Sequence, residues 1–91
     1  MSAIAKQQKA KGDTFMAEAK KTLAARSWFS SKDAKYEGAA EAMTNAGNAY
    51  KVGGFYHEAG DAYKQAAEMY RDHLKNSFEA SKALQNAGKG G

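Results

Sequence analysis

The residues that could carry acid–base or metal chemistry in this 91-residue chain are few and scattered. His57 and His73 are well separated, no acidic partner stands at the spacing of a metal-ligand set, and the chain contains no cysteine. We expect both histidines, with Asp61 and Asp72, to lie at the surface. The glycine pair at 53–54 follows a predicted helix and lacks the Gly-Lys-Ser/Thr ending of a phosphate-binding loop. The sequence therefore predicts no catalytic residues, metal or cofactor, and no enzyme.

Trp28 and Phe29 offer a different chemistry, as adjacent aromatic residues within the serine-rich stretch SWFSS. Aromatic rings suit the headgroup depth of a bilayer, and nearby cations attract anionic lipid. The cations around this stretch are Lys20, Lys21, Arg26 and Lys32. Because two rings bury little area, such attachment would be weak and reversible. The alternative is that both rings fold back onto the flanking helices as a small core plug, since exposed tryptophan is uncommon.

Positive charge is concentrated in the first third of the chain. The net charge is +4; residues 1–32 hold seven Lys and Arg against Asp13 and Glu18, whereas residues 33–91 hold seven against eight. This excess indicates either a solvated helix face or an acidic partner surface. No apolar run reaches the length of a membrane span, and the N-terminus lacks the apolar core of a secretory signal. We therefore expect a cytoplasmic protein.

Four segments carry apolar and small residues at helical spacing, which predicts an all-α fold. The first covers about residues 3–25. The second follows SWFSS, where Ser30 and Asp33 are spaced as a capping box, and ends at the glycine pair 53–54. The third begins near Tyr56 and continues to Leu74. The fourth is capped by Asn76 or Ser77 and ends in GKGG.

A short phrase repeats within these segments. AGNAYK at 46–51 recurs as AGDAYK at 59–64, and NAG returns at 86–88. Small residues let helices approach closely while the tyrosines fill the neighbouring volume, which is the packing of a helical solenoid. Residues 40–73 resemble the tetratricopeptide repeat, a general binding scaffold. The aromatic residues fall on the predicted core stripes, which argues against nucleic acid as a partner.

A wider resemblance covers nearly the whole chain. The lysine-rich first helix, SWFSS, the phrases AGNAYK and AAEMY, and the final NAG resemble the N-terminal part of the soluble NSF attachment proteins (SNAPs). The resemblance implies a non-catalytic adaptor of SNARE-dependent vesicle fusion, peripherally associated with membranes. It also implies that the loop with Trp28 and Phe29 touches the anionic membrane surface. The alternative is a general tetratricopeptide interaction module without a membrane role.

The resemblance further implies partners and an architecture. A basic surface would grip the acidic SNARE complex, with Lys51 and Lys89 at family lysine positions, although Gly54 stands where another basic residue is expected. The family's C-terminal region, which engages the NSF-type ATPase, is expected to be absent from this chain. We expect residues 1–32 to form a basic helix and aromatic loop. Residues 33–91 would form antiparallel tetratricopeptide-like hairpins, as one continuous domain or part of a longer solenoid.

Overall fold

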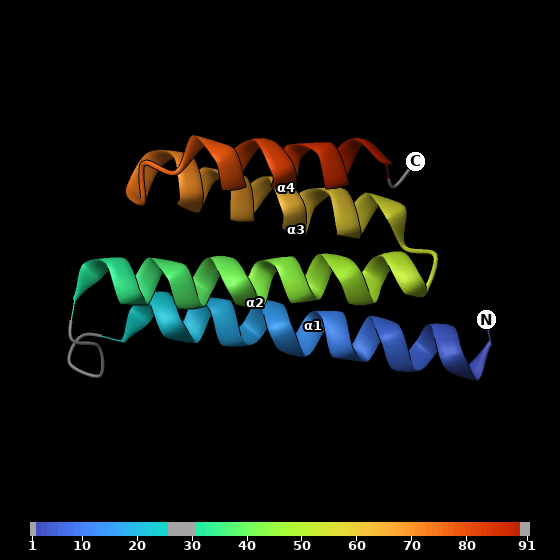
Figure 1. Ribbon diagram of the computed structural model, residues 1–91. Coiled ribbons are helices and arrows are strands. Elements are labelled where there is room, and N and C mark those ends of the chain that lie inside the picture. The colour runs from blue at the N-terminus through green and yellow to red at the C-terminus, as the bar shows by residue number, and fades with distance from the viewer. Residues whose placement is uncertain (1, 26–30, 90–91) are drawn as a thin grey trace.

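A computed structural model describes residues 2–25 and 31–89, with the side chain of Lys89 outside the description. The order is α1 (Ala3–Ala24), α2 (Lys32–Val52), α3 (Tyr56–Glu68), a π-helical turn η1 (Met69–His73) and α4 (Ser77–Lys89). Each helix packs against its neighbour in the chain, and the four helices alternate in direction (Figure 1). The predicted all-α array of antiparallel hairpins is confirmed, and the described residues contain no strand.

Side-chain caps mark where three of the helices begin. At α1 the Ser2 hydroxyl accepts a hydrogen bond from the Ala5 amide at 3.1 Å. The Ser31 hydroxyl accepts a hydrogen bond from the Ala34 amide at 3.2 Å at the start of α2. The prediction of Ser30 as the cap was therefore wrong by one residue, and Ser30 itself lies outside the described residues. At α4 the Asn76 side chain accepts from the Glu79 amide at 3.1 Å, which confirms the first of the two predicted caps.

The turn between α2 and α3 depends on glycine. The Gly53 amide donates to the carbonyl of Ala49 at 3.1 Å, and Gly54 follows at φ +85°, in the left-handed region. The Phe55 amide then donates to the carbonyl of Tyr50 at 2.8 Å, and α3 begins at the next residue. The predicted end of the second helix and start of the third are confirmed.

The third helix does not run unbroken to Leu74 as predicted. Regular α-helix ends at Glu68, and the wider turn η1 follows, closed by the Leu74 amide donating to the carbonyl of Met69 at 3.1 Å. Lys75 then adopts a left-handed conformation at φ 54°. The exposed His73 ring stacks on Tyr36 with centroids 4.0 Å apart, so the last turn of this segment is held against α2.

The core is made largely of alanine, and this allows close contact between helices. One cluster joins all four helices, and a second joins α2 and α3 around two tyrosines. Tyr63 is the largest fully buried side chain described. The first cluster contains Ala19, Met43, Ala66, Ala67, Ala80 and Ala83, and the second contains Ala46, Tyr50, Ala59, Ala62 and Tyr63. Small side chains bring the helix axes together, and the two tyrosine rings fill the remaining volume.

Candidate functional site

The candidate membrane site lies where α1 ends and α2 begins. Lys20 and Lys21 are in the last turns of α1, and Lys32 is the first residue of α2. All three are exposed, and the ion pairs seen among the described residues involve other side chains. The predicted contact residues Trp28 and Phe29, with Arg26, lie outside the described residues. The structure therefore brings three of the four predicted cations to the segment that carries the aromatic pair.

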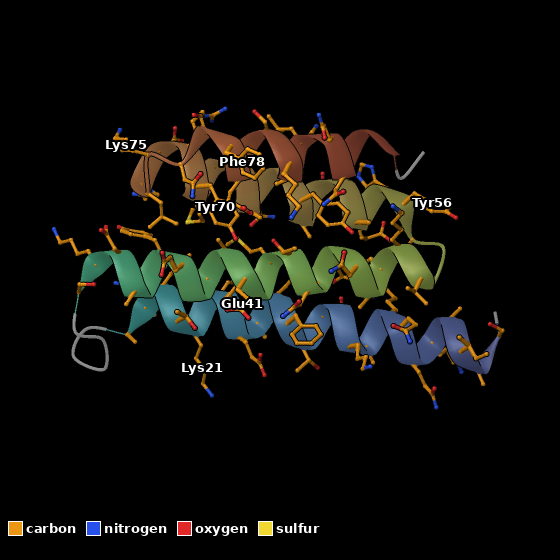
Figure 2. The ribbon with its side chains drawn as sticks, viewed as in Figure 1. Lys21, Glu41, Tyr56, Tyr70, Lys75 and Phe78 are labelled. Carbon is orange, nitrogen blue, oxygen red and sulfur yellow. The ribbon has the colours of Figure 1, made fainter. Side chains whose placement is uncertain are left out.

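Sequence reasoning missed a fourth lysine at this end. The connection between η1 and α4 returns to the same end of the array as the α1–α2 connection (Figure 1). Exposed Lys75 lies on it, as Figure 2 shows together with Lys21 on α1. Lys75 is remote from Lys32 in sequence, and only the antiparallel arrangement brings the two hairpin ends together. The predicted end of the third helix at Leu74 and the predicted cap at Asn76 could have indicated that Lys75 lies in a turn between two helices.

Arg71 is also near this end, but it has a partner. Its Nε donates to Asp72 Oδ1 at 3.0 Å. This hydrogen bond raises the pKa of Arg71 and lowers the pKa of the Asp72 carboxyl, with their mutual attraction adding to both effects. Arg71 is therefore a weaker candidate for contact with an anionic surface than Lys75.

The two predicted SNARE-facing lysines lie at the opposite end. Half-buried Lys51 is in the last turn of α2, and Lys89 is the last residue of α4; both helices end on the side away from the α1–α2 connection (Figure 1). With 21 residues in α2, Lys51 is about 30 Å from Lys32. Among the described residues, the positions of the predicted cations thus fall into two groups, one at each end of the array.

The backbone of the turn next to Lys51 favours glycine at position 54. Gly54 has φ +85°, which is unfavourable for a residue with a side chain, although no atom lies within 4 Å of the position that a β-carbon would occupy. Backbone conformation, rather than lack of space, favours glycine there.

The described residues provide no other obvious chemical centre. They hold no group of three His, Asp or Glu side chains close enough to bind a metal ion. His57 is exposed and lies 3.5 Å from the exposed carboxylate of Asp61. Among these residues no helix combines the length and hydrophobicity that a membrane span requires.

The comparisons with known proteins agree with the residue pattern. The family model described as soluble NSF attachment protein, SNAP, matches residues 10–90. The probable vesicular-fusion protein sec17 homolog of Neurospora crassa is 37% identical over 76 residues, which cover 79% of this chain and 26% of that protein. The chain thus spans about a quarter of the length of this relative. No solved structure matches significantly. With the family model matching nearly its whole length, the chain belongs to the soluble NSF attachment protein family.

Proposed function

We propose that this chain is a non-catalytic adaptor of SNARE-dependent vesicle fusion that binds SNARE complexes and touches anionic membranes through the loop with Trp28 and Phe29. The observation that carries this proposal is the family match over residues 10–90. The relative from Neurospora crassa is named as a vesicular-fusion protein, which supports the same role. The chain would act in the cytoplasm, peripherally associated with membranes.

The arrangement of cations supports the membrane contact. Lys20, Lys21 and Lys32 flank the loop, and Lys75 joins them from the second hairpin. Each lysine close to an anionic leaflet contributes about 1 kcal/mol, and the two rings add apolar contact at headgroup depth. Binding of this size is reversible and weakens as salt screens the charges.

The lysines at the opposite end of the array support the proposal of a protein partner. A chain attached at the loop end would hold Lys51 and Lys89 away from the bilayer, where cytosolic acidic helices are accessible. These two lysines would contact the acidic surface of a SNARE complex. In the full-length family architecture, the NSF-type ATPase would be engaged by the C-terminal region of the family. The alignment covers 26% of the fungal relative.

Liposome co-sedimentation tests the membrane contact. The wild type should sediment with phosphatidylserine-containing vesicles and less with phosphatidylcholine vesicles. The double variant Trp28→Ser/Phe29→Ser should remain in the supernatant. Lys21→Glu should weaken binding, whereas Lys6→Glu is a matched control because it makes the same charge change on α1 near the other end of that helix.

Two results would decide against this proposal or part of it. Equal sedimentation of the wild type and the double variant would remove the aromatic loop from the mechanism. Binding to a soluble SNARE complex with no binding to either kind of vesicle would favour the general interaction module. For the SNARE contact, Lys51→Glu should reduce capture by an immobilised SNARE complex, and exposed Lys64→Glu on α3 is the control.

A further inference from the structure

Aromatic rings join neighbouring helices in the core at two places. The ring of Tyr50 on α2 lies directly on Gly12 of α1, where a β-carbon would be only 2.5 Å from the ring. The ring of Tyr63 on α3 lies in the same way on Gly47 of α2. Both rings are almost fully buried, so these contacts hold the helices together and leave little ring surface for a partner.

A third ring contact lies at the surface. Tyr36 of α2 and His73, the last residue of η1, stack with their centroids 4.0 Å apart and their planes 9° apart. His73 is exposed and Tyr36 is half-buried. The stack links the hairpin of α1 and α2 to the last turn before α4 in the second hairpin. It therefore helps to set how the two hairpins meet at the end of the array that carries the α1–α2 connection, which we call the loop end.

The two segments joined by the stack each carry a lysine close to it. Lys32 precedes Tyr36 by four residues, which is about 6 Å along α2. Lys75 follows His73 by two residues, so their Cα atoms are at most about 7 Å apart. Figure 2 shows Lys75 at the loop end. The stack thus joins the backbone that carries Lys32 to the backbone that carries Lys75.

Local hydrogen bonds fix Lys75 relative to the stacked ring. The Leu74 amide donates to the carbonyl of Met69 at 3.1 Å, and the Asn76 amide donates to the carbonyl of Tyr70 at 2.7 Å. Lys75 lies between two residues that are held in this way. A displacement of the histidine ring would therefore also displace Lys75.

The charge of each segment is small when it is taken alone. Residues 32–36 and residues 71–75 each carry one net positive charge with histidine neutral. In the second segment Arg71 is paired with Asp72, so Lys75 supplies the excess. Attraction to an anionic bilayer rises with each lysine near the surface. A strong attraction therefore requires both segments to lie together with Lys20 and Lys21.

We propose that the stack of Tyr36 and His73 is a positioning contact for membrane binding. It holds Lys75 beside the lysines of the first hairpin, so that an anionic phospholipid surface contacts both hairpin ends at once. The two residues act through their rings, and neither ring touches lipid. This role rests on the proposed membrane contact of the loop, and it extends the lipid-facing surface from one hairpin to two.

Co-sedimentation with phosphatidylserine-containing vesicles tests the coupling between Lys75 and the stack. Lys75→Gln should weaken binding about fivefold, which is the usual contribution of one lysine near an anionic leaflet. His73→Ala, which removes the stack, should weaken binding by a similar factor. Adding Lys75→Gln to His73→Ala should then weaken binding by less than about twofold, because the lysine is no longer held at the surface.

Two control variants separate a positioning role from a general loss of structure. His73→Phe keeps a ring that can stack but carries no charge, so it should bind as the wild type does. Lys21→Glu should weaken binding equally in the wild type and in His73→Ala, because Lys21 is on α1. Circular dichroism checks that each variant is folded. In NMR spectra, Tyr36→Leu should shift the ring-proton signals of His73, because the ring current of the tyrosine is lost.

Each contrary result has a distinct meaning. An effect of Lys75→Gln that is as large in His73→Ala as in the wild type would overturn the positioning role. Equal loss of binding in His73→Phe and His73→Ala would also overturn it, because stacking would then not be the cause. If Lys75→Gln binds as the wild type does while Trp28→Ser/Phe29→Ser does not bind, the loop contact stands and the two-hairpin surface is wrong. A wild type that binds no vesicles would overturn both.

Discussion

At the scale of single residues, glycine and tyrosine determine how the helices meet. Gly12 and Gly47 each receive a ring, whereas Gly60 carries none. The sequence phrases AGNAYK and AGDAYK indicated alternating small and large positions, and this pairing is observed. The hydroxyl partners, Asp13 and Asn48, could not be predicted in this way, because the phrase does not show which residue of a neighbouring helix lies opposite a tyrosine.

Alanine substitutions at these glycines should have opposite effects. Gly47→Ala should destabilise the protein by about 1–3 kcal/mol, because its methyl group would meet the buried Tyr63 ring. Gly60→Ala should stabilise it by about 0.5–1 kcal/mol, because alanine favours helix and meets no neighbour. Urea unfolding monitored by circular dichroism measures both changes. Equal effects of the two substitutions would contradict the finding that a ring covers Gly47 but not Gly60.

The hydrogen bond between Tyr50 and Asp13 should make the stability of the protein depend on pH. The hydrogen bond from Tyr50, followed by that from Lys9, lowers the pKa of the Asp13 carboxyl below its usual value of 3.8. A carboxyl with a lower pKa in the folded state adds stability above its unfolded pKa and loses it as the pH falls through the folded value. The wild type should therefore exceed Asp13→Asn in stability at about pH 6, and the difference should shrink towards about pH 2.

Tyr50→Phe provides the matched variant for this measurement. It keeps the ring on Gly12 but removes the hydroxyl, which is the largest cause of the lowered pKa of Asp13. Its stability should change less between about pH 6 and about pH 2 than that of the wild type. Urea unfolding at each pH measures the difference. An unchanged pH dependence in Tyr50→Phe would mean that the hydroxyl does not stabilise the carboxylate.

At the scale of the elements, local signals predicted most boundaries. The glycine pair at 53–54 and the cap Asn76 have a direct conformational or hydrogen-bonding role, so their residue types predict a turn and a helix start. The π-helical turn η1 was not predictable because Met69–His73 contains no Gly or Pro to mark a change. This turn also makes a contact with a distant part of the chain, because the His73 ring stacks on Tyr36 of α2.

Lys75 tests the energetic cost of this irregular connection. A lysine at φ 54° is in a region that costs a non-glycine residue about 1–2 kcal/mol. Lys75→Gly should therefore stabilise the protein by about 0.5–1 kcal/mol after the greater flexibility of unfolded glycine is included. Lys64→Gly, on the exposed face of α3, is the control and should destabilise by about 1 kcal/mol. Thermal unfolding measures both changes. A loss of stability in Lys75→Gly would mean that the left-handed conformation of Lys75 is not strained.

At the scale of the whole molecule, the antiparallel array separates the two groups of cations. It extends 41 Å along its longest axis. Lys32, the first residue of α2, and Lys75, before α4, lie at one end, whereas Lys51 is in the last turn of α2 towards the other end (Figures 1 and 2). The sequence predicted which lysines were candidates but not this division, because contacts between distant segments decide which hairpin ends lie together. Lys75 belongs to the loop end for that reason alone.

This division predicts the orientation of the bound protein. The chain has no cysteine, so Ala24→Cys at the loop end and Val52→Cys at the end of α2 can each carry one environment-sensitive fluorophore. Both positions are exposed. If the loop end touches the bilayer, the probe at position 24 should brighten on phosphatidylserine vesicles. The probe at position 52 should remain as in water, because about 30 Å separates the two ends of α2. Equal brightening at both positions would mean that the helices lie flat on the membrane, and brightening at position 52 alone would place the opposite end in contact with lipid.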